Sequence, residues 1–480
     1  MSLPFEQLEL RRFIEQVPSM PTALHVVNPF TGEVDRRYAY HGPEDTLERV
    51  TQLKMRQREW ALLSVAERVE RVAKALDYFE QHADVIAQDI SCQMGRPVHQ
   101  ARGEIQGLLE RGRYMCTIAE ATLAAESLPT KQGFDRSIHH APYGLIYVIS
   151  AWNYPLLITV NSIVPALIAG NTVLLKHARQ TTEIGHHFAR AFASVFTAPV
   201  LENVVITHEL SEALIRNGCV DHVVFTGSVA AGQRILAQCA DSVMAPHLEL
   251  GGKDGVYVDG SVNVSEAAEN VVEGACYNAG QSCCGIERAY VHESVYKAFI
   301  VEAERRLSAY RLGDPQHPDT TMGPLAIASN AETMVKQVEA ACAAGARCVS
   351  GGRVLTIENG TFFQPTLLVD VPREALVLKE ENFGPILAVV PVSGVDEAIA
   401  EINASELGLT SVIYTTDLAQ AESFFQRVQT GTVFMNRCDY LDPALPWTGF
   451  KKSGCGSALS RFGFYSVTQR KAKHFRLCQV

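Results

Sequence analysis

The feature that most constrains the fold is a regular alternation of short apolar runs with amphipathic stretches. Residues 144–150 and 172–176 are apolar runs of strand length, and a helical stretch around residues 160–169 separates them. Two further runs, at residues 203–206 and 222–225, continue the pattern. Strand, helix and strand at this spacing predict a parallel sheet of Rossmann type, because parallel strands need a long crossover that is usually a helix. The chain is therefore predicted to be an α/β protein.

The segments around this sheet extend the prediction. Residues 46–125 have few glycines and many Glu and Arg residues at helical spacing, so long helices are expected there. A second α/β unit is predicted after Glu249, with strands at residues 255–258, 288–291, 388–392 and 411–414. Residues 127–142 are polar and, by themselves, are compatible with a surface loop.

Length and charge exclude several classes of protein. The 480 residues, 47% of them hydrophobic, are enough for about two to four domains with substantial cores. A net charge of −11 argues against a nucleic-acid partner or an anionic membrane. The first residues show no basic region followed by an apolar run, so no secretory signal is expected. The most apolar region, residues 144–170, is interrupted by Asn and Pro residues and suits buried elements better than a membrane span.

Cysteine and histidine usage predicts a reducing compartment and no metal site. The twelve cysteines are scattered, with one vicinal pair at Cys283 and Cys284 and no Cys-x-x-Cys spacing. Reduced thiols in a cytoplasmic protein are the expectation. The histidine pairs at residues 139–140 and 186–187 lack companion ligands at metal-binding spacing, so no metal is expected.

A cysteine that follows a Gly-Gln turn and a glutamate upstream of it are the strongest candidates for chemistry. Cys283 ends the segment Asn-Ala-Gly-Gln-Ser-Cys at residues 278–283, and Glu249 begins Glu-Leu-Gly-Gly-Lys. A thiolate attacks carbonyl carbon and leaves readily, so it divides an oxidation into two easier steps. A glutamate can activate water if burial raises its pKa from about 4.3 towards neutrality. The two segments predict a thiol nucleophile and a carboxylate base.

Eight short segments of the chain carry recognisable motifs, at residues 28–33, 151–153, 169–176, 225–228, 249–253, 280–283, 381–385 and 449–454. In this order they resemble the motifs of the aldehyde dehydrogenase superfamily, over nearly the whole chain. The resemblance implies oxidation of a small-molecule aldehyde by a non-acylating, NAD(P)-dependent enzyme that forms a homodimer or homotetramer. It implies a Rossmann-like cofactor-binding domain at residues 1–125 and 144–249, a second α/β catalytic domain at 250–435, and a small β oligomerisation element at 126–143 and 436–480.

The resemblance also implies a catalytic sequence. Cys283 adds to the aldehyde, hydride passes to the nicotinamide, and Glu249 activates the water that hydrolyses the resulting thioester. Asn153 is expected to donate its side-chain amide to the oxyanion, together with the backbone N–H of Cys283; one such donor is worth ~10²–10³ in rate. Relatives that pass the acyl group to coenzyme A commonly lack this glutamate, so its presence favours hydrolysis. From its position alone, Cys284 is the next residue along the chain, so on a strand or helix its side chain is expected to point away from the site, and it is interpreted as structural or redox-sensitive.

Cofactor contacts are expected on both α/β units. Gly227, Ser228 and Gly232 follow a predicted strand and open a predicted helix, where backbone N–H groups can face a pyrophosphate. By resemblance, Lys176 contacts the adenosine ribose and Glu381 holds the nicotinamide ribose. The same resemblance adds Trp152, Leu250 and Phe383 to the cofactor site.

Four departures from the family pattern bear on function. Arg179 stands near the ribose site where relatives often have a carboxylate; because a guanidinium pairs well with phosphate, both NAD and NADP stay open as cofactors. Residues 207–210 replace a common Gly-x-Gly on the adenine side. Ala458 replaces a glutamate that can help a proton relay in relatives. Residues 446–450 read Pro-Trp-Thr-Gly-Phe near the expected mouth of the substrate tunnel.

The substrate and two rival functions stay open at this stage. Aromatic residues in the expected tunnel favour a medium-sized or aromatic aldehyde. Arg437 could anchor the distal carboxylate of a semialdehyde, or it could pair with Asp439 or Asp442. A cofactor-independent cysteine esterase and a non-catalytic scaffold on the same fold are the alternatives. The residues expected in the tunnel are Tyr154, Leu157, Tyr277, Ser282, Arg437, Cys438, Tyr440 and Trp447.

Overall fold

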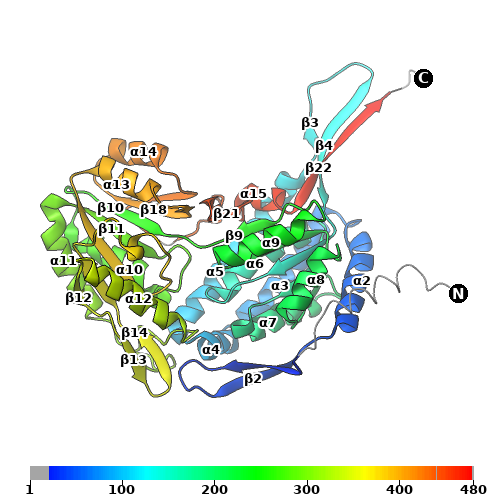
Figure 1. The fold of residues 1–480 in the computed structure, drawn as a ribbon. Helices are drawn as coiled ribbons and strands as arrows, with labels where there is room; N and C mark the ends of the chain where they lie inside the picture. Colours follow the sequence, from blue (N-terminus) through cyan, green and yellow to red (C-terminus); the bar gives the residue numbers. More distant parts are fainter. Residues whose placement is uncertain (1–20, 439, 478–480) are drawn as a thin grey trace.

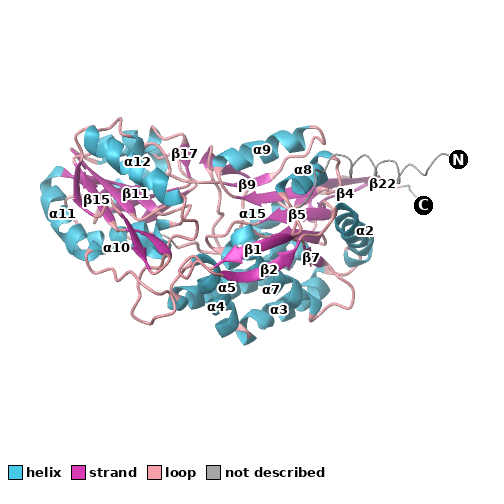
Figure 2. Ribbon diagram, turned by 60° about the horizontal axis from the view of Figure 1, so that its bottom comes forward, coloured by secondary structure: helices cyan, strands magenta, loops and turns pink. Residues whose placement is uncertain are grey.

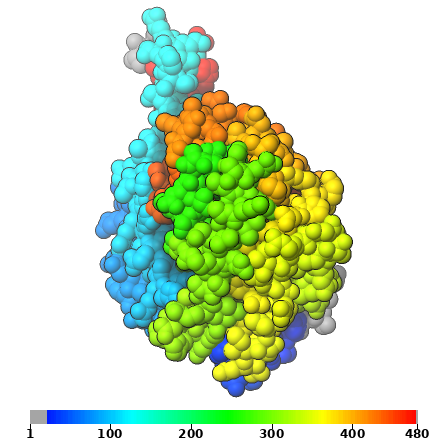
Figure 3. All heavy atoms as spheres, turned by 90° about the vertical axis from the view of Figure 1, so that its left-hand side faces the viewer, coloured from blue at the N-terminus to red at the C-terminus, as the bar shows by residue number. Residues whose placement is uncertain are grey.

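The computed structural model describes residues 21–438 and 440–477. Two α/β units lie side by side, and a narrow antiparallel sheet projects from one of them (Figure 1). The space-filling view shows this projection standing clear of a rounded body (Figure 3). Among the described residues, no helix is long and apolar enough to cross a membrane.

The first unit is built on the predicted parallel sheet. In the described chain this sheet has the strand order β21-β9-β8-β5-β6-β7. The chain runs outward from β5 to β6 and β7 and then returns to β8 on the other side of β5, so the order reverses between β5 and β8. The strands are β5 (Leu145–Ile149), β6 (Thr172–Lys176), β7 (Leu201–Asn203), β8 (His222–Thr226), β9 (His247–Glu249) and β21 (Gly454–Cys455).

One strand begins earlier than the sequence indicates. Residues 203–206 were the expected strand, whereas β7 covers Leu201–Asn203. After Val204 the backbone leaves the sheet, because Val205 exchanges hydrogen bonds with His41: its N–H donates to Nδ1 at 2.9 Å, and its carbonyl accepts from the His41 N–H at 2.8 Å.

Helices cover both faces of this sheet (Figure 2). Alternate residues of β5 point to opposite faces: Ile146 and Val148 join a core made with α3 to α7, while Leu145 and Tyr147 join a core made with α2, α8 and α9. The long helices expected at residues 46–125 are present. The helices are α2 (Pro43–Trp60), α3 (Val65–Gln81), α4 (Ala83–Met94), α5 (Val98–Leu123), α6 (Pro155–Ile168), α7 (Thr182–Ala193), α8 (His208–Arg216) and α9 (Val229–Ala240).

The second unit has its own sheet and its own core. Within the described residues the strand order is β12-β15-β16-β11-β10-β18-β19, parallel except for β12. Its strands are β10 (Asp254–Val258), β11 (Ile286–His292), β12 (Arg347–Ser350), β15 (Thr366–Val369), β16 (Ile386–Val392), β18 (Thr410–Tyr414) and β19 (Thr432–Met435). Its helices are α10 (Val264–Cys276), α11 (Glu293–Leu307), α12 (Asn330–Ala343), α13 (Val395–Asn403) and α14 (Leu418–Arg427).

The projecting sheet joins two distant parts of the chain. Strand β4 (Phe134–Pro142) pairs antiparallel with β22 (Thr468–Arg476) and with the short β3 (Glu126–Ser127). The polar segment at residues 127–142 is therefore largely strand. Before β22, the C-terminal segment touches both units: β20 (Phe450–Lys451) pairs with β17 (Leu407–Gly408), and β21 joins the first sheet. The remaining elements are β1 (Ala23–Val27), β2 (Val34–Ala39), β13 (Val354–Ile357), β14 (Gly360–Phe363), α15 (Ser460–Tyr465), η1 (Arg179–Thr181), η2 (Tyr277–Gly280) and η3 (Leu376–Leu378).

Candidate active site

The carboxyl ends of the first sheet's strands bring several predicted residues together. Asn153 lies in the turn after β5, Ser228 follows β8, Lys176 ends β6 and Glu249 ends β9. The order of the sheet reverses between β5 and β8, and ligands of such sheets bind outside the carboxyl ends at that point. The fold therefore places these residues at the carboxyl edge of one sheet, where such ligands bind.

Cys283 lies in a tight turn between η2 and β11. The approach to it is left-handed at three consecutive residues: Asn278, Ala279 and Gly280 have φ angles of 55°, 54° and 69°. At Gly280 a Cβ atom would lie 2.2 Å from the backbone of Gly384, so a side chain has no room there. The Gly-Gln turn thus lets the cysteine loop pack directly on the backbone of the second unit, and the Cys283 side chain stays half-buried.

A buried arginine, Arg96, ties the cysteine loop to the Asn153 turn. Its Nε donates to Oδ1 of Asn278 at 3.0 Å, and its other nitrogens donate to the Asn153 carbonyl and the Glu104 carboxylate. The Asn278 amide also donates to the Asn153 carbonyl, at 3.1 Å. Sequence reasoning missed Arg96. The signal that could have indicated it is the glycine just before it, Gly95, which caps α4 in the left-handed conformation.

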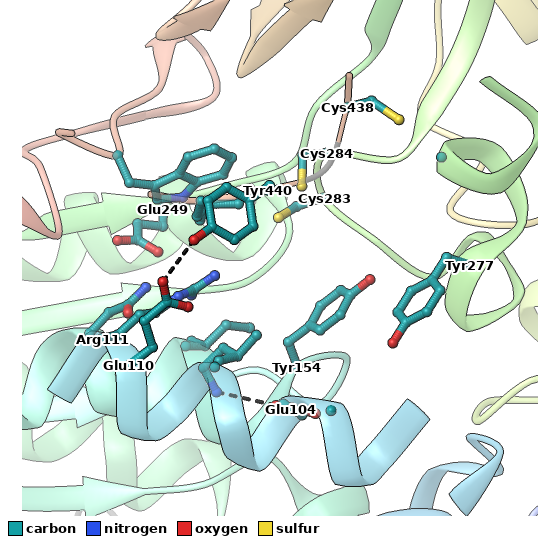
Figure 4. Close-up of a pocket in the computed structure, with 18 of the residues that line it drawn as sticks. Glu104, Glu110, Arg111, Tyr154, Glu249, Tyr277, Cys283, Cys284, Cys438 and Tyr440 are labelled. Carbon is teal, nitrogen blue, oxygen red and sulfur yellow. Dashed lines mark hydrogen bonds between the residues drawn. The ribbon is translucent and has the colours of Figure 1, made fainter. Parts of the chain in front are cut away.

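Cys283 and Glu249 line the same cavity, which has a volume of about 690 Å³ (Figure 4). Six residues predicted for the tunnel line it: Tyr154, Leu157, Tyr277, Cys438, Tyr440 and Trp447. Ser282 and Arg437 lie outside this lining. One wall that the sequence did not indicate comes from α5 and the turn before it, and includes Arg96, Glu104, Gly107, Glu110 and Arg111.

The expectation that Cys284 points away from the site is wrong. Cys284 is buried and lines the same cavity as Cys283. The expectation assumed a strand or helix, where neighbouring side chains diverge, but both cysteines lie in a turn that precedes β11. Cys284 packs in an apolar cluster with Leu409, Trp447 and Leu459.

Arg437 makes a contact that the sequence did not indicate. Its guanidinium lies over the ring of Tyr440, 4.3 Å from the ring centroid. The Tyr440 hydroxyl in turn donates to Glu110 on α5 at 2.7 Å, which joins the C-terminal segment to the α5 wall of the cavity (Figure 4). Asp442 accepts from the backbone N–H of Ala444 at 2.8 Å. The predicted pairing with Asp439 lies outside the described residues.

Glu249 has the environment that a neutral-pH base requires. Its side chain is buried at the end of β9, with only 8% of the residue exposed. Burial raises the pKa of its carboxyl from the usual 4.5 to about 7, against the opposing effects of the Arg111 charge and the Thr226 hydroxyl. About half of the carboxyl groups are therefore ionised at neutral pH, which suits general-base catalysis.

The start of α9 has the features of a phosphate-binding helix terminus. The Ser228 hydroxyl caps the helix by accepting from the Ala231 N–H at 3.3 Å. At Gly232 a Cβ atom would lie 2.5 Å from the Leu250 side chain, so this glycine lets α9 pack against the segment that follows Glu249. The first turn of α9 leaves backbone N–H groups without helical partners at the carboxyl edge of the sheet. Gly227, Ser228 and Gly232, predicted from the sequence to face a pyrophosphate, therefore lie at a helix start whose free N–H groups could bind an anion.

Three basic side chains gather beyond the ends of β6 and β7. Burial and the nearby Arg179 lower the pKa of Lys176 to about 8. Arg179 is exposed at the start of η1, and His208 is the first residue of α8. Burial, Lys176 and Arg179 also lower the pKa of His208. Mutual repulsion of this kind marks a place where an anionic group would be stabilised.

The residues predicted for the nicotinamide side also meet across the two units. Trp152 of the first unit contacts Phe383 of the second edge to face, with ring centroids 5.6 Å apart. Glu381 accepts from the Gly252 N–H at 3.0 Å. Glu287, which sequence reasoning missed, fixes this turn: it accepts from the backbone N–H of Phe383 at 3.0 Å and pairs with buried Lys253.

One cluster elsewhere has the composition of a metal site. The ligand atoms of Asp89, Glu183 and His187 lie within 4.8 Å of one another. Arg36 pairs with Asp89 at 2.9 Å, and Arg190 pairs with Glu183 at 2.7 Å. These guanidinium groups supply the positive charge that the carboxylates need, so the cluster is an ion-pair network of the first unit.

Comparison with known proteins connects these features. The sequence matches the protein-family model described as aldehyde dehydrogenase family over residues 16–473. It is 33% identical over 447 residues to succinate-semialdehyde dehydrogenase (NADP+) 1 of Mycobacterium tuberculosis, which covers 92% of this chain and 97% of that protein. It is 31% identical to the putative aldehyde dehydrogenase DhaS of Bacillus subtilis, across 93% of this chain and 90% of that protein. A solved structure of lactaldehyde dehydrogenase from Escherichia coli matches with a TM-score of 0.91 at 29% identity, over 95% of this chain and 96% of that one.

Proposed function

The chain belongs to the aldehyde dehydrogenase family, and from that premise we propose that it oxidises its aldehyde through a thioester on Cys283, hydrolysed by water that Glu249 activates. NAD(P)-dependent oxidation of an aldehyde to a carboxylic acid is the activity, of the EC 1.2.1 type. One observation carries the residue assignments. Cys283 and Glu249 come from different α/β units, yet both line one cavity, and burial keeps the glutamate half-ionised at neutral pH.

The first half of the proposed mechanism forms the thioester. The Cys283 sulfur adds to the aldehyde carbon, and the carbonyl oxygen becomes an oxyanion. The Asn153 side-chain amide and the backbone N–H of Cys283 stabilise that oxyanion, since Arg96 and Asn278 hold the turn and the loop against each other. A nicotinamide ring held by Trp152, Glu381 and Phe383 would supply the hydride acceptor for the tetrahedral carbon. Collapse of the oxyanion leaves an acyl group on the Cys283 sulfur.

The second half releases the acid. Glu249 in its carboxylate form takes a proton from a water molecule as that water attacks the thioester carbon. The carboxylic acid leaves and the Cys283 thiolate is restored. Because the carboxylate is the active form and its pKa is about 7, the rate of this half-reaction should rise with pH through about 7 and then level off.

Intact-mass spectrometry of a Glu249→Gln variant tests the assignment. Mixed with an aldehyde and NADP+, this variant should accumulate a mass increase equal to one acyl group, and peptide mapping should locate the group on Cys283. A Glu249→Gln/Cys283→Ala variant should stay unmodified. An acyl group on another residue, or full turnover by Glu249→Gln, would contradict the proposal.

We propose NADP as the preferred form of the cofactor. Gly227, Ser228 and Gly232 would face its pyrophosphate, and Trp152, Leu250, Glu381 and Phe383 would surround its nicotinamide end. Lys176, Arg179 and His208 would then surround the 2′-phosphate, where the lowered pKa values of Lys176 and His208 support an anion site. The named mycobacterial relative also uses NADP+.

A second candidate is narrower: a semialdehyde whose distal carboxylate is held by Arg111. This buried guanidinium lines the cavity, whereas Arg437 is exposed and outside it. Arg111→Met should raise KM for acidic aldehydes by ~10-fold or more and leave KM for neutral aldehydes within ~2-fold, because only the acids lose a charge partner. Arg437→Met is the matched control. Since Arg111 also lowers the pKa of Glu249, the comparison belongs at pH 9, where that carboxyl is ionised. Equal losses for both aldehyde classes would reject the idea.

Assembly and compartment complete the proposal. We propose the three-part division given above, with the sheet of β3, β4 and β22 joining copies into a homodimer or homotetramer. Phe475 on β22 is 60% exposed, an apolar surface that a partner subunit would cover. Phe475→Glu should lower the mass measured by light scattering, and an unchanged mass would count against this surface.

The described cysteines carry no disulfide, which favours the cytoplasm.

A further inference from the structure

A buried histidine faces the proposed base from the same strand. His247 and Glu249 are two residues apart on β9, so their side chains lie on one face of the sheet. Nε2 of His247 lies 3.5 Å from Oε1 of Glu249. Within the described residues, neither of these two buried atoms has a hydrogen-bond partner. Buried polar atoms normally have one, so two such atoms facing each other indicate a contact used by one protonation state.

The backbone beside His247 is shaped around its ring. Gly456 has a φ of 90°, and a Cβ atom there would lie 2.7 Å from the imidazole. The glycine therefore makes room for the histidine. Two residues along is Ala458, a buried side chain with no proton to exchange. On this side of Glu249 the imidazole of His247 is therefore the described group that can accept a proton from it.

The other polar groups facing the pair leave the imidazole as the available acceptor. Arg111 of α5 is a permanent cation, and the Thr226 hydroxyl of β8 is a weak base. On the far side of His247 lies a second buried imidazole, His222 of β8, close enough to lower the pKa of His247. His222 stacks on half-buried Tyr143, with ring centroids 4.3 Å apart. The line Glu249, His247, His222 thus leads from the cavity towards the base of the β4–β22 sheet.

We propose that His247 relays the proton of Glu249 out of the cavity after water has attacked the thioester, an inference that rests on the proposed role of Glu249 as the base. Protonated Glu249 gives its proton from Oε1 to the lone pair at Nε2 of His247, which restores the carboxylate and makes an imidazolium. The imidazolium then releases its Nδ1 proton to solvent water along the His222 side. The neutral ring returns to its first tautomer by proton exchange with water.

The pKa values of His247 and Glu249 agree with a histidine that carries the proton only briefly. Burial lowers the pKa of His247 to about 3, while the pKa of Glu249 is about 7. The imidazolium is therefore a short-lived species and never the resting state. A proton transfer uphill by this difference is still far faster than a typical turnover of about 10 s⁻¹.

The test follows decay of the acyl-enzyme directly, by quenched-flow mass spectrometry after mixing with aldehyde and NADP+, in H₂O and in D₂O. His247→Gln keeps a hydrogen-bonding side chain that cannot carry a proton. His247→Ala leaves a space that free imidazole can enter. Thr226→Val is the matched control, because it removes a different polar neighbour of Glu249 without touching the relay.

In His247→Gln we expect normal acylation, acyl-enzyme decay slowed ~10–100-fold, and a larger D₂O effect on that decay. Added imidazole should restore decay in His247→Ala, which also serves if the Gln variant does not fold. Thr226→Val should only move the pH midpoint of decay upward, since it removes a group that lowers the pKa of Glu249. The relay would be overturned if the acyl-enzyme decayed at the wild-type rate in both His247 variants but did not decay in Glu249→Gln. That result would leave the role of Glu249 as the base intact. Wild-type decay in Glu249→Gln would instead overturn the proposed function.

Discussion

The two α/β units contribute to the site by opposite means. The first unit presents Asn153, Ser228 and Glu249 just beyond the carboxyl ends of its strands, where the reversal in strand order opens a crevice. The second unit presents Cys283 and Phe383 in loops that lead into strands β11 and β16. Sheet topology positions the first set. Left-handed backbone, a glycine contact and the Arg96 hydrogen bonds position the second. Single substitutions near the site should therefore displace Cys283 and Phe383 of the second unit more readily than the site residues of the first unit.

The largest effect should come from the thiol itself. Cys283→Ala removes the nucleophile, so turnover should fall at least ~10⁴-fold while cofactor binding persists. Cys284→Ala is the matched control: it lines the same cavity from the next position, and turnover should stay within ~10-fold. Steady-state formation of NADPH at 340 nm measures both. Comparable losses of turnover in the two variants would show that activity depends on the conformation of the turn and not on the Cys283 sulfur alone.

A substitution at Arg96 asks whether local hydrogen bonds position the cysteine loop. In Arg96→Met/Glu104→Gln, no buried charge is left unpaired, but the links to Asn278 and the Asn153 carbonyl are gone. We expect kcat to fall ~10²-fold, since a displacement of about 1 Å can cost that much. Glu104→Gln alone leaves the Arg96 hydrogen bonds to Asn278 and the Asn153 carbonyl in place, so kcat should fall less, although loss of the buried charge pair should lower the free energy of unfolding. If the double variant has the same kcat as Glu104→Gln, packing and not the Arg96 hydrogen bonds holds the cysteine loop. The two units would then position their site residues by more similar means.

Protonation of Glu249 provides a stability test of the first unit. The folded-state pKa of about 7 exceeds the usual 4.5, so the folded protein binds the extra proton between these values and its free energy of unfolding falls as pH rises through them. The ionised carboxylate should cost on the order of 3 kcal/mol above pH 7. Relative to the wild type, Glu249→Gln should therefore gain stability from pH 5 to pH 8 in denaturant titrations. If Glu249→Gln changed the free energy of unfolding by the same amount at both pH values, burial would not raise the pKa of this carboxyl.

The smallest effect is expected at the cofactor's adenosine end. Arg179→Gln should lower kcat/KM for NADP+ by ~10–30-fold and leave the value for NAD+ nearly unchanged, because only NADP+ carries the 2′-phosphate. Arg216→Gln, an exposed arginine at the opposite end of α8 from His208, is the control. Parallel losses with both cofactors would place Arg179 outside the phosphate site.

Much of this molecule follows from short-range patterns. The apolar runs at residues 144–150, 172–176 and 222–225 became β5, β6 and β8, because a strand buried on both faces needs apolar residues at every position. The order of motifs identified the family, and the role of base predicted for Glu249 required that burial raise the pKa of its carboxyl, as it does. The expected strand at residues 203–206 shifted because distant His41 forms both backbone hydrogen bonds of Val205, through its ring Nδ1 and its own N–H.

The sequence by itself determined the α/β class and the family, and it predicted Cys283 and Glu249 as nucleophile and base, since each conclusion rests on short motifs and on their order along the chain. Only the tertiary structure decided that Arg96 joins two loops, that Cys284 shares the cavity, that Arg437 lies outside it, and that His247 faces Glu249. Those facts depend on which atoms meet across the two units and across neighbouring strands. Such contacts are fixed by packing and register, which no local stretch of sequence contains.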